Sequence, residues 1–332
     1  MKFAAFGRTQ ILYDSILACI ERGHSLVLLG TSKASPESPI KEDDFAKLAK
    51  RLSVPFFNDT RINQNKYMDL VRQSSAEIAI SMNCLTLINQ QMLDLFTYGI
   101  INAHPGDLPR FRGNACPNWA IIAGEPRIVV TLHQMSTELD AGPICLKREM
   151  PLSYSTYIGD IYKFLQEAIP QMFCEVLDAF ENQSLRPTPQ PDDPASSLRV
   201  FPRLPQDSEI DWSKPAVMLA RLVRASAEPF AGAYTMLNGT KLIIWRAHAS
   251  QLPYPYMGTP GQVAELHRKS GEVSVITGEG ILIIEEVEDP DGKRCKAAEL
   301  IRSARTHLGF DISNEILKLK ARITDLENRF NE

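Results

Sequence analysis

Residues 2–29 read KFAAFGRTQILYDSILACIERGHSLVLL, and this stretch decides the fold. Its apolar runs Lys2–Phe6 and Ser25–Leu29 have the length and content of buried strands, whereas Thr9–Arg22 carries apolar residues at helical spacing. Gly23 follows as a helix-terminating glycine. The stretch therefore predicts a strand, a helix and a second strand, the unit from which parallel sheets are built.

The same alternation of apolar runs and helical-period segments continues to about residue 150. Further strands are expected at Glu77–Ser81, Gly99–Ala103 and Arg127–Met135. Further helices are expected at Glu42–Leu52, Gln64–Gln73, Ile88–Leu95, Asn114–Ala123 and Tyr157–Glu181. This order predicts an α/β fold, a Rossmann-like open and mostly parallel sheet with helices on both faces.

Four prolines and polar residues fill the segment 185–198, which indicates a stiff linker after a first domain of residues 1–184. Short strands separated by glycine turns follow, and they predict a small β-barrel of the OB type over residues 199–308. The expected barrel strands are Ala233–Leu237, Lys241–His248, Gly261–Leu266, Val273–Ile276 and Ile281–Glu286.

Residues 309–332 are predicted to form an amphipathic terminal helix. The apolar residues Ile312, Ile316, Leu319, Ile323, Leu326 and Phe330 recur at spacings of 4, 3, 4, 3 and 4, the a/d pattern of a heptad repeat. The pattern is shorter than the roughly three to four heptads typical of a coiled coil. Two interpretations therefore stay open, a helix packed on its own barrel and a homodimer through residues 312–330.

The composition is that of an ordinary globular protein. Among 332 residues, 36 Lys and Arg against 40 Asp and Glu give a formal charge of -4, without the broad basic surface of a nucleic-acid-binding protein. Six dispersed cysteines without a Cys-x-x-Cys pair fit neither a zinc site nor a disulfide framework. No apolar run approaches the roughly 18 residues of a membrane span. We therefore expect a cytoplasmic protein with free thiols.

The segment 99–113, GIINAHPGDLPRFRG, holds the first candidate site residues. Asn102 and His104 are two residues apart on an extended chain, so their side chains point to the same side. Pro105 disfavours helical angles at His104, and Gly106 permits a sharp turn directly afterwards. The pair is thus expected at the carboxyl edge of a parallel strand, where open α/β sheets bind ligands.

A second motif, Asp140-Ala-Gly142, follows on the other side of a predicted strand. Together with Asn102-Ala-His104, Leu108-Pro109 and Arg112-Gly113, it resembles the folate-dependent formyltransferase superfamily. Residues 209–216, 222–225 and 229–233 are also similar to the C-terminal region shared by methionyl-tRNA formyltransferases, formyltetrahydrofolate dehydrogenases and the formyltransferase half of the bifunctional polymyxin-resistance enzyme. The resemblance covers about residues 1–305.

The resemblance implies transfer of a formyl group from 10-formyltetrahydrofolate to an amine, without a metal. The reaction passes through a tetrahedral centre whose oxygen becomes negative while the attacking nitrogen becomes positive. Asn102 and His104 can donate hydrogen bonds to that oxyanion. Asp140 can orient His104 and accept, directly or through water, the proton that the amine loses. These three residues are the predicted catalytic set.

The resemblance also implies that main-chain groups of two loops hold the pterin ring. The matching residues are Met82, Asn83, Cys84 and Leu85 in one loop, and Ser136, Thr137 and Leu139 in the other. Arg112 and Pro109 are candidates for substrate binding, although an arginine in such a loop is as often structural. His133 is expected in the core or behind the site, and Cys116 has no evident base partner that would make it a nucleophile.

The acceptor amine is predicted from local sequence. The loop of residues 31–44 has two lysines against four acidic residues, where methionyl-tRNA formyltransferases carry a basic loop. Pro117-Asn118-Trp119 and Val130–His133 resemble instead the sugar N-formyltransferase half of the polymyxin-resistance enzyme. The sequence therefore favours a nucleotide-linked amino sugar and disfavours nucleic acid. Methionyl-tRNA, another small amine, hydrolysis of 10-formyltetrahydrofolate and a non-catalytic binding protein remain as alternatives.

Overall fold

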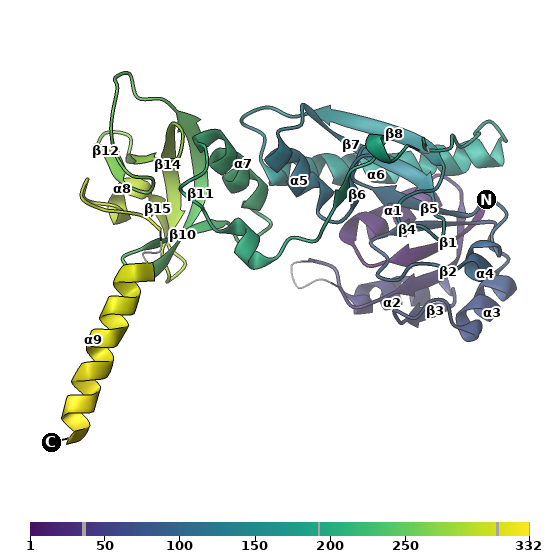
Figure 1. Cartoon of the computed structure of the whole chain (residues 1–332). Helices are drawn as coiled ribbons and strands as arrows, with labels where there is room; N and C mark the ends of the chain where they lie inside the picture. The colour runs from purple at the N-terminus through teal and green to yellow at the C-terminus, as the bar shows by residue number, and fades with distance from the viewer. Residues whose placement is uncertain (35–37, 192, 310–311, 332) are drawn as a thin grey trace. The chain divides into compact units, whose positions relative to one another are not determined.

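The computed structural model describes residues 1–34, 38–191, 193–309 and 312–331. Its internal contacts divide the chain into two compact units, Met1–Arg203 and Leu204–Glu332 (Figure 1). Each unit contains a cluster of buried apolar side chains of its own.

A seven-stranded sheet with the order β3-β2-β1-β4-β5-β7-β8 forms the centre of the first unit (Figure 1). Its strands are β1 (Lys2–Gly7), β2 (Ser25–Thr31), β3 (Phe56–Asn58), β4 (Ile78–Met82), β5 (Ile100–His104), β7 (Arg127–Gln134) and β8 (Ile144–Pro151). The five strands from β3 to β5 are parallel. Consecutive residues of β1 and β4 are buried, so both faces of the sheet are covered. The predicted α/β fold with a mostly parallel sheet is confirmed.

The last two strands of the order, β7 and β8, run antiparallel to their neighbours. The sequence did not indicate β8, because Lys147, Arg148 and Glu149 interrupt its apolar pattern. In the structure, alternate residues of β8 are exposed, as at a sheet edge that has one face open to water.

Helices connect the strands of the first unit and cover the sheet. They are α1 (Gln10–Glu21), α2 (Glu42–Leu52), α3 (Asn65–Ser74), α4 (Gln90–Leu93), α5 (Cys116–Ala123) and α6 (Ile158–Glu181). Thr9 begins α1 because its hydroxyl oxygen accepts a hydrogen bond from the backbone N–H of Leu12 at 3.2 Å. Helices α1 and α6 pack against each other, with Sγ of Cys19 in α1 lying 3.9 Å from Sγ of Cys174 in α6.

The proline-rich segment after α6 pairs with two strands of the first unit, β8 and β6 (Arg112–Gly113). Thr188 and Ile144 exchange two backbone hydrogen bonds of 2.8 Å. Strand β9 (Arg199–Val200) pairs in parallel with β6, directly after the turn that follows β5. These contacts hold the segment on the first unit as far as Arg203, whereas the expected barrel begins at residue 199.

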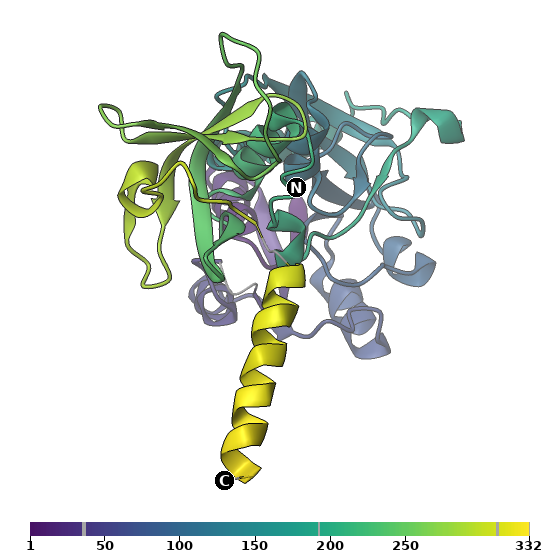
Figure 2. The ribbon, with the colours of Figure 1, turned by 60° about the vertical axis from the view of Figure 1, so that its left-hand side comes forward.

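The second unit is a curved antiparallel sheet with helices α7 (Ala216–Ser226) and α8 (Ala297–Leu300) (Figure 2). Its strands are β10 (Ala233–Leu237), β11 (Thr240–Ser250), β12 (Val263–His267), β13 (Glu272–Ile276), β14 (Ile281–Glu288) and β15 (Arg294–Lys296), in the order β10-β11-β14-β13-β12 with β15 on β14. Backbone N–H groups of Leu308 and Gly309 donate to Gly261 and Met236, at the two open edges. This last segment closes the sheet into the predicted small barrel.

Helix α9 (Ile312–Asn331) ends the chain and is drawn in yellow in Figures 1 and 2. Every side chain from Ile316 to Arg329 is exposed, so these side chains do not pack on the barrel. The side chains of Ile312 and Phe330, at the two ends of the predicted heptad pattern, lie outside the described part of the molecule. Among the described residues, no helix has the length and apolar character that crossing a membrane requires.

Candidate active site

A row of polar side chains crosses three neighbouring strands of the first unit. Asn102 of β5 pairs in register with Ser81 of β4 on one side and with His133 of β7 on the other. Residues paired in register point to the same face of a sheet, and His104 shares that face because it lies two residues after Asn102. Ser81 is fully buried, and its Oγ has no hydrogen-bond partner among the described residues. The strand register thus gathers the polar groups, including Ser81, which no sequence motif indicates.

His133 holds the side-chain amide of Asn102. Its Nδ1–H donates to the backbone carbonyl of Gln134 at 2.9 Å, which leaves Nε2 to accept from Nδ2–H of Asn102 at 3.3 Å. Burial, and after it the neighbouring His104, lowers the pKa of His133 to about 4. The ring is therefore neutral near pH 7 and keeps its acceptor nitrogen. His133 therefore supports the site from behind Asn102. This is one of the two locations expected for it, the core or the region behind the site.

His104 is buried, and both of its ring nitrogens have neighbours. Nε2–H donates to the backbone carbonyl of Phe111 at 2.7 Å, and Nδ1 lies 3.6 Å from Oδ2 of Asp140. Gly106 makes room for the ring, because a Cβ atom at this position would lie 2.6 Å from Nε2. The turn of residues 105–111 therefore folds tightly around the imidazole.

Asp140 lies between the two histidines. Its Oδ2 accepts a hydrogen bond from the backbone N–H of Gly113 at 2.9 Å, and its Oδ1 lies 3.7 Å from Nε2 of His133. The residue has a φ of 52°, in the left-handed region where Asp and Asn are the best-tolerated side chains other than Gly. The structure thus brings Asn102, His104 and Asp140 together around His133.

Cys116 lies beside His104 without the features of a nucleophile. Its Sγ–H donates to the carbonyl of Phe111 at 3.0 Å, and Sγ is 3.6 Å from Nε2 of His104. Burial, and after it the charge of Asp140, raises the pKa of the Cys116 thiol to about 12. The thiol therefore stays protonated at neutral pH and serves as a hydrogen-bond donor.

Gln190 of the proline-rich segment holds the loop that carries Asp140. Its Nε2 donates to the backbone carbonyls of Asp140 and Gly142, both at 2.8 Å, and its Oε1 accepts from Nη2 of Arg112 at 2.7 Å. Nε of Arg112 is buried and has no hydrogen-bond partner among the described residues. Arg112 therefore uses Nη2 to bind Gln190, whereas its Nε–H donates to no described residue. Gln190 lies in a polar segment without a motif, so the sequence carries no signal that points to it.

The two loops expected to hold a pterin ring begin at strands on either side of β5. Met82 ends β4, and Asn83 follows with a left-handed φ of 57°. Burial raises the pKa of the Cys84 thiol, whose Sγ–H donates to Thr86, whereas Leu85 is half exposed. In the other loop, Oγ of Ser136 donates to the carbonyl of Glu138, Thr137 is exposed and Leu139 is partly buried. Pro109 follows a cis peptide bond in the turn after His104.

A cavity of about 550 Å³ lies beside the turn that follows β5. Asp107, Arg110 and Phe111 of that turn line it, together with Arg127 of β7 and Glu149 of β8. Its charges are paired: Arg110 lies 2.6 Å from Glu125, and Arg127 lies 3.0 Å from Glu149. The cavity therefore adjoins the candidate site but presents ion pairs rather than free charge.

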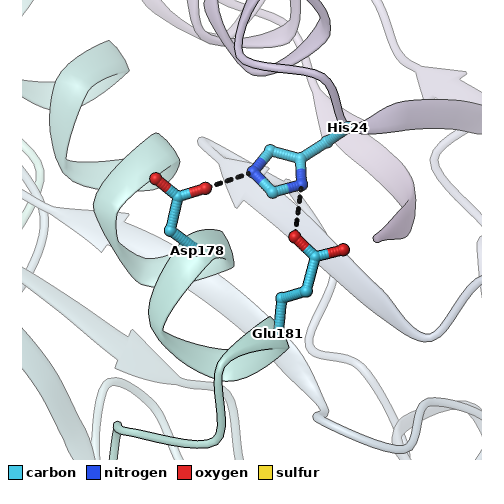
Figure 3. Close-up of side chains that lie close together, drawn as sticks. All are labelled: His24, Asp178 and Glu181. Atoms are coloured by element: carbon cyan, nitrogen blue, oxygen red, sulfur yellow. Dashed lines mark hydrogen bonds and ion pairs between the residues drawn. The ribbon is translucent and has the colours of Figure 1, made fainter.

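One group of potential metal ligands occurs among the described residues, His24, Asp178 and Glu181 (Figure 3). Nε2 of His24 lies 3.1 Å from Asp178, and cationic groups already neutralise the carboxylates: Arg22 lies 2.9 Å from Asp178 and the amino group of Met1 lies 2.7 Å from Glu181. His24 directly precedes β2, at the amino edge of the parallel strands. The group is thus an ion-pair cluster that joins α6 to the turn before β2, away from the carboxyl edge that bears His104.

Comparison with known proteins identifies the class. Residues 1–177 match the family model described as formyl transferase, and residues 204–305 match that of the formyl transferase C-terminal domain. The chain belongs to the formyl transferase family and is a formyl-transferring enzyme.

Individual relatives span several activities. The chain is 29% identical over 305 residues to methionyl-tRNA formyltransferase of Pelobacter propionicus, covering 89% of this chain and 91% of that protein. The N-formyltransferase of Helicobacter canadensis, solved with folinic acid and dTDP-3-aminofucose, has a TM-score of 0.65 at 15% identity and covers 86% and 98% of the two chains. HypX of Aquifex aeolicus has a TM-score of 0.57 at 20% identity, and the match covers 91% of this chain but about half of HypX, 49%. At these identities, the two solved structures show a shared fold.

Proposed function

We propose that the enzyme moves a formyl group from 10-formyltetrahydrofolate to the amine of a nucleotide-linked amino sugar. The observation that carries the proposal is the grouping of Asn102, His104 and Asp140 at one edge of the sheet, with Asp140 3.6 Å from His104. An amide donor, an imidazole and a carboxylate at one point are the groups that formyl transfer to an amine needs.

Each residue has a distinct task in the proposed reaction. When the amine attacks the formyl carbon, the carbonyl oxygen becomes negative, and Asn102 donates to it with the amide hydrogen that His133 does not use. His104 donates from Nε2 by exchanging the carbonyl of Phe111 for the oxyanion. Asp140 accepts, directly or through water, the proton that the amine loses. The intermediate then collapses: the carbonyl re-forms, the bond between the formyl carbon and N10 of the folate breaks, and the proton passes from Asp140 to N10, so that tetrahydrofolate leaves. Each donor to an oxyanion is worth about 10²–10³ in turnover.

Two sets of relatives support the folate donor. The sugar 3N-formyltransferase WlaRD was solved with 5-N-formyl-THF and dTDP, the Helicobacter canadensis enzyme with folinic acid, and HypX of Aquifex aeolicus with tetrahydrofolic acid. In this chain, the loops of residues 82–85 and 136–139 flank β5 through its two neighbouring strands. Main-chain groups of these loops would hold the pterin ring beside the catalytic residues.

The charge of the loop after β2 and of Arg112 favours a small anionic acceptor. The loop of residues 31–44 carries two lysines against four acidic residues, which repels the phosphates of a tRNA acceptor stem. The unused Nε of Arg112 could donate to an anionic acceptor such as the phosphate of a nucleotide-linked sugar. Methionyl-tRNA is the second candidate, because a relative of 29% identity carries that name.

The test measures release of tetrahydrofolate from 10-formyltetrahydrofolate against a panel of acceptors. The panel contains nucleotide-linked amino sugars, charged initiator tRNA, small amines and a reaction without acceptor. Wild type is compared with Asn102→Ala and His104→Ala, and with Asn328→Ala in α9 as a control outside the site. We expect turnover with one amino sugar that both site variants reduce by at least about 10²-fold and the control leaves unchanged.

Other outcomes assign other functions. Turnover with charged tRNA alone would replace the proposed acceptor while keeping the chemistry. Equal turnover without any acceptor would identify a hydrolase. A lack of turnover across the panel, combined with no binding of tetrahydrofolate, would contradict the proposed donor site.

A further inference from the structure

A face of α9 carries large apolar side chains that are open to water. Ile316, Leu319, Ile323 and Leu326 are exposed by 46%, 59%, 54% and 43%. They recur at spacings of 3, 4 and 3, so they lie along one side of the helix, and we name them the α9 stripe. Exposed apolar surface that is contiguous and regularly spaced marks an interaction site more often than a solvated face.

The residue types of the α9 stripe indicate what covers it. In the heptad frame, Ile316 and Ile323 occupy a positions, and Leu319 and Leu326 occupy d positions. In parallel coiled coils, a β-branched residue at a with leucine at d favours two strands over three or four. The stripe thus fits a second helix of the same sequence rather than an unrelated groove.

Charged residues beside the stripe favour the same arrangement. Arg322 occupies a g position and Glu327 the following e position. In a parallel pair, Arg322 of one helix faces Glu327 of the partner subunit, and symmetry repeats the pair on the other side. In an antiparallel pair, g faces g, which brings the two Arg322 side chains together when the helices are centred there. Opposite charges therefore meet in the parallel arrangement.

We propose that α9 binds α9 of a second copy of this chain as a parallel two-stranded coiled coil, with the α9 stripe as its seam. The helix of 20 residues is about 30 Å long, enough for two complete heptads with their flanking turns. The proposal uses surface features of α9 alone and is independent of the reaction and its acceptor.

The experiment measures the mass of the full chain in solution from about 1 to 100 μM, by light scattering and sedimentation. We expect twice the protomer mass of 37.2 kDa for the wild type. Ile323→Glu puts two carboxylates into the seam and should raise the dimer dissociation constant at least about 100-fold. Ala321→Glu is the matched control: it adds the same charge at the outward f position of the same helix, so the dimer should persist.

Charge exchange tests the orientation. Arg322→Glu should weaken the dimer by facing the partner's Glu327 with a like charge, and the double variant Arg322→Glu/Glu327→Arg should restore it. Thermal unfolding of each variant checks that both of its compact units stay folded. A monomeric wild type, a mass of three or more protomers, a dimer that survives Ile323→Glu, or a double variant as weak as the single one would each overturn the proposal.

Discussion

The carboxylate of Asp140 lies close to three other residues of the candidate site, Gly113, His104 and His133. Asp140 accepts from Gly113, lies 3.6 Å from His104 and 3.7 Å from His133, and sits in a backbone conformation that asparagine shares. A change to Asn therefore removes the charge while it keeps the loop geometry. This makes the role of the charge separable from the role of the fold.

For Asp140→Asn we expect kcat to fall by about 10²-fold or more, because the amide cannot take a proton from the attacking amine. Steady-state kinetics give kcat and KM, and thermal unfolding checks the fold. KM for the formyl donor should change little, since main-chain groups hold the pterin ring in the proposed site. Unchanged kcat in a folded variant would contradict a proton-accepting role for Asp140.

His133 predicts a pH dependence of stability. Burial and His104 lower its pKa to about 4 in the folded chain, against an ordinary value of about 6.5. Between these values the unfolded chain binds a proton that the folded chain does not, so the free energy of unfolding decreases as the pH falls from 6.5 to 4. Asp140 opposes the shift and Arg112 adds to it.

The check is urea unfolding at pH 7.5 and pH 5 for the wild type and His133→Gln. The wild type should lose about 2 kcal/mol more than the variant between the two pH values. If the wild type and His133→Gln lose the same free energy of unfolding, His133 has the same pKa in the folded and the unfolded chain.

At the scale of elements, the sequence predicted those strands and helices whose apolar residues follow a regular strand or helix spacing along the whole element. β1, β10 and α6 agree with the expected ranges to within a residue or two. The sequence did not predict β8, because this edge strand mixes charged and apolar residues. It also did not predict that β7 runs antiparallel to β5, because an alternation of apolar and polar residues is the same in either strand direction. The pairing of His133 with Asn102 depends on that direction, so the sequence could name both residues without predicting their contact.

Gln190 could not be found from the sequence because its partners lie up to 78 residues away and only the folded segment brings them together. Its contacts predict a positioning role. Gln190→Glu keeps the acceptor for Arg112 but replaces the two donations to Asp140 and Gly142 with repulsion. We expect kcat to fall about 10-fold or more with a smaller change in KM, since the loop bearing Asp140 shifts.

The control for this variant is Gln183→Glu, an exposed position in the same connecting region. It introduces the same charge and should leave kcat unchanged. If Gln190→Glu keeps the wild-type kcat, the loop of Asp140 stays in place without the hydrogen bonds from the Gln190 side chain.

In the barrel, a buried hydrogen bond between two side chains links the chain before α7 to β10. Nε1–H of Trp212 donates to Oγ1 of Thr235 at 2.9 Å, and both residues are buried. Thr235→Val keeps the shape but leaves the indole N–H unpaired, which should lower the free energy of unfolding by about 1–3 kcal/mol. Urea unfolding measures it, with the exposed Thr240→Val as control; equal values for both variants would contradict the assigned contribution.

At the scale of the whole molecule, charge distinguishes the acceptors. The chain carries a formal charge of -4, with 36 basic against 40 acidic residues. A tRNA acceptor bound through several phosphates would lose about 10³–10⁵ in affinity between roughly 50 and 200 mM salt, because counterions compete with each phosphate contact. A nucleotide-linked sugar presents few phosphates, so its binding depends on salt far less.

We therefore expect kcat/KM for the preferred acceptor to fall by less than about tenfold across that range of salt. The measurement is initial velocity at low acceptor concentration, with the donor saturating so that its own salt dependence does not enter. A decrease of about 10³-fold or more would instead indicate an extended phosphate backbone on the acceptor. Such a decrease would mean that folding gathers basic residues on one surface, although acidic residues balance them in the sequence. The proposed acceptor would then change from a nucleotide-linked sugar to tRNA.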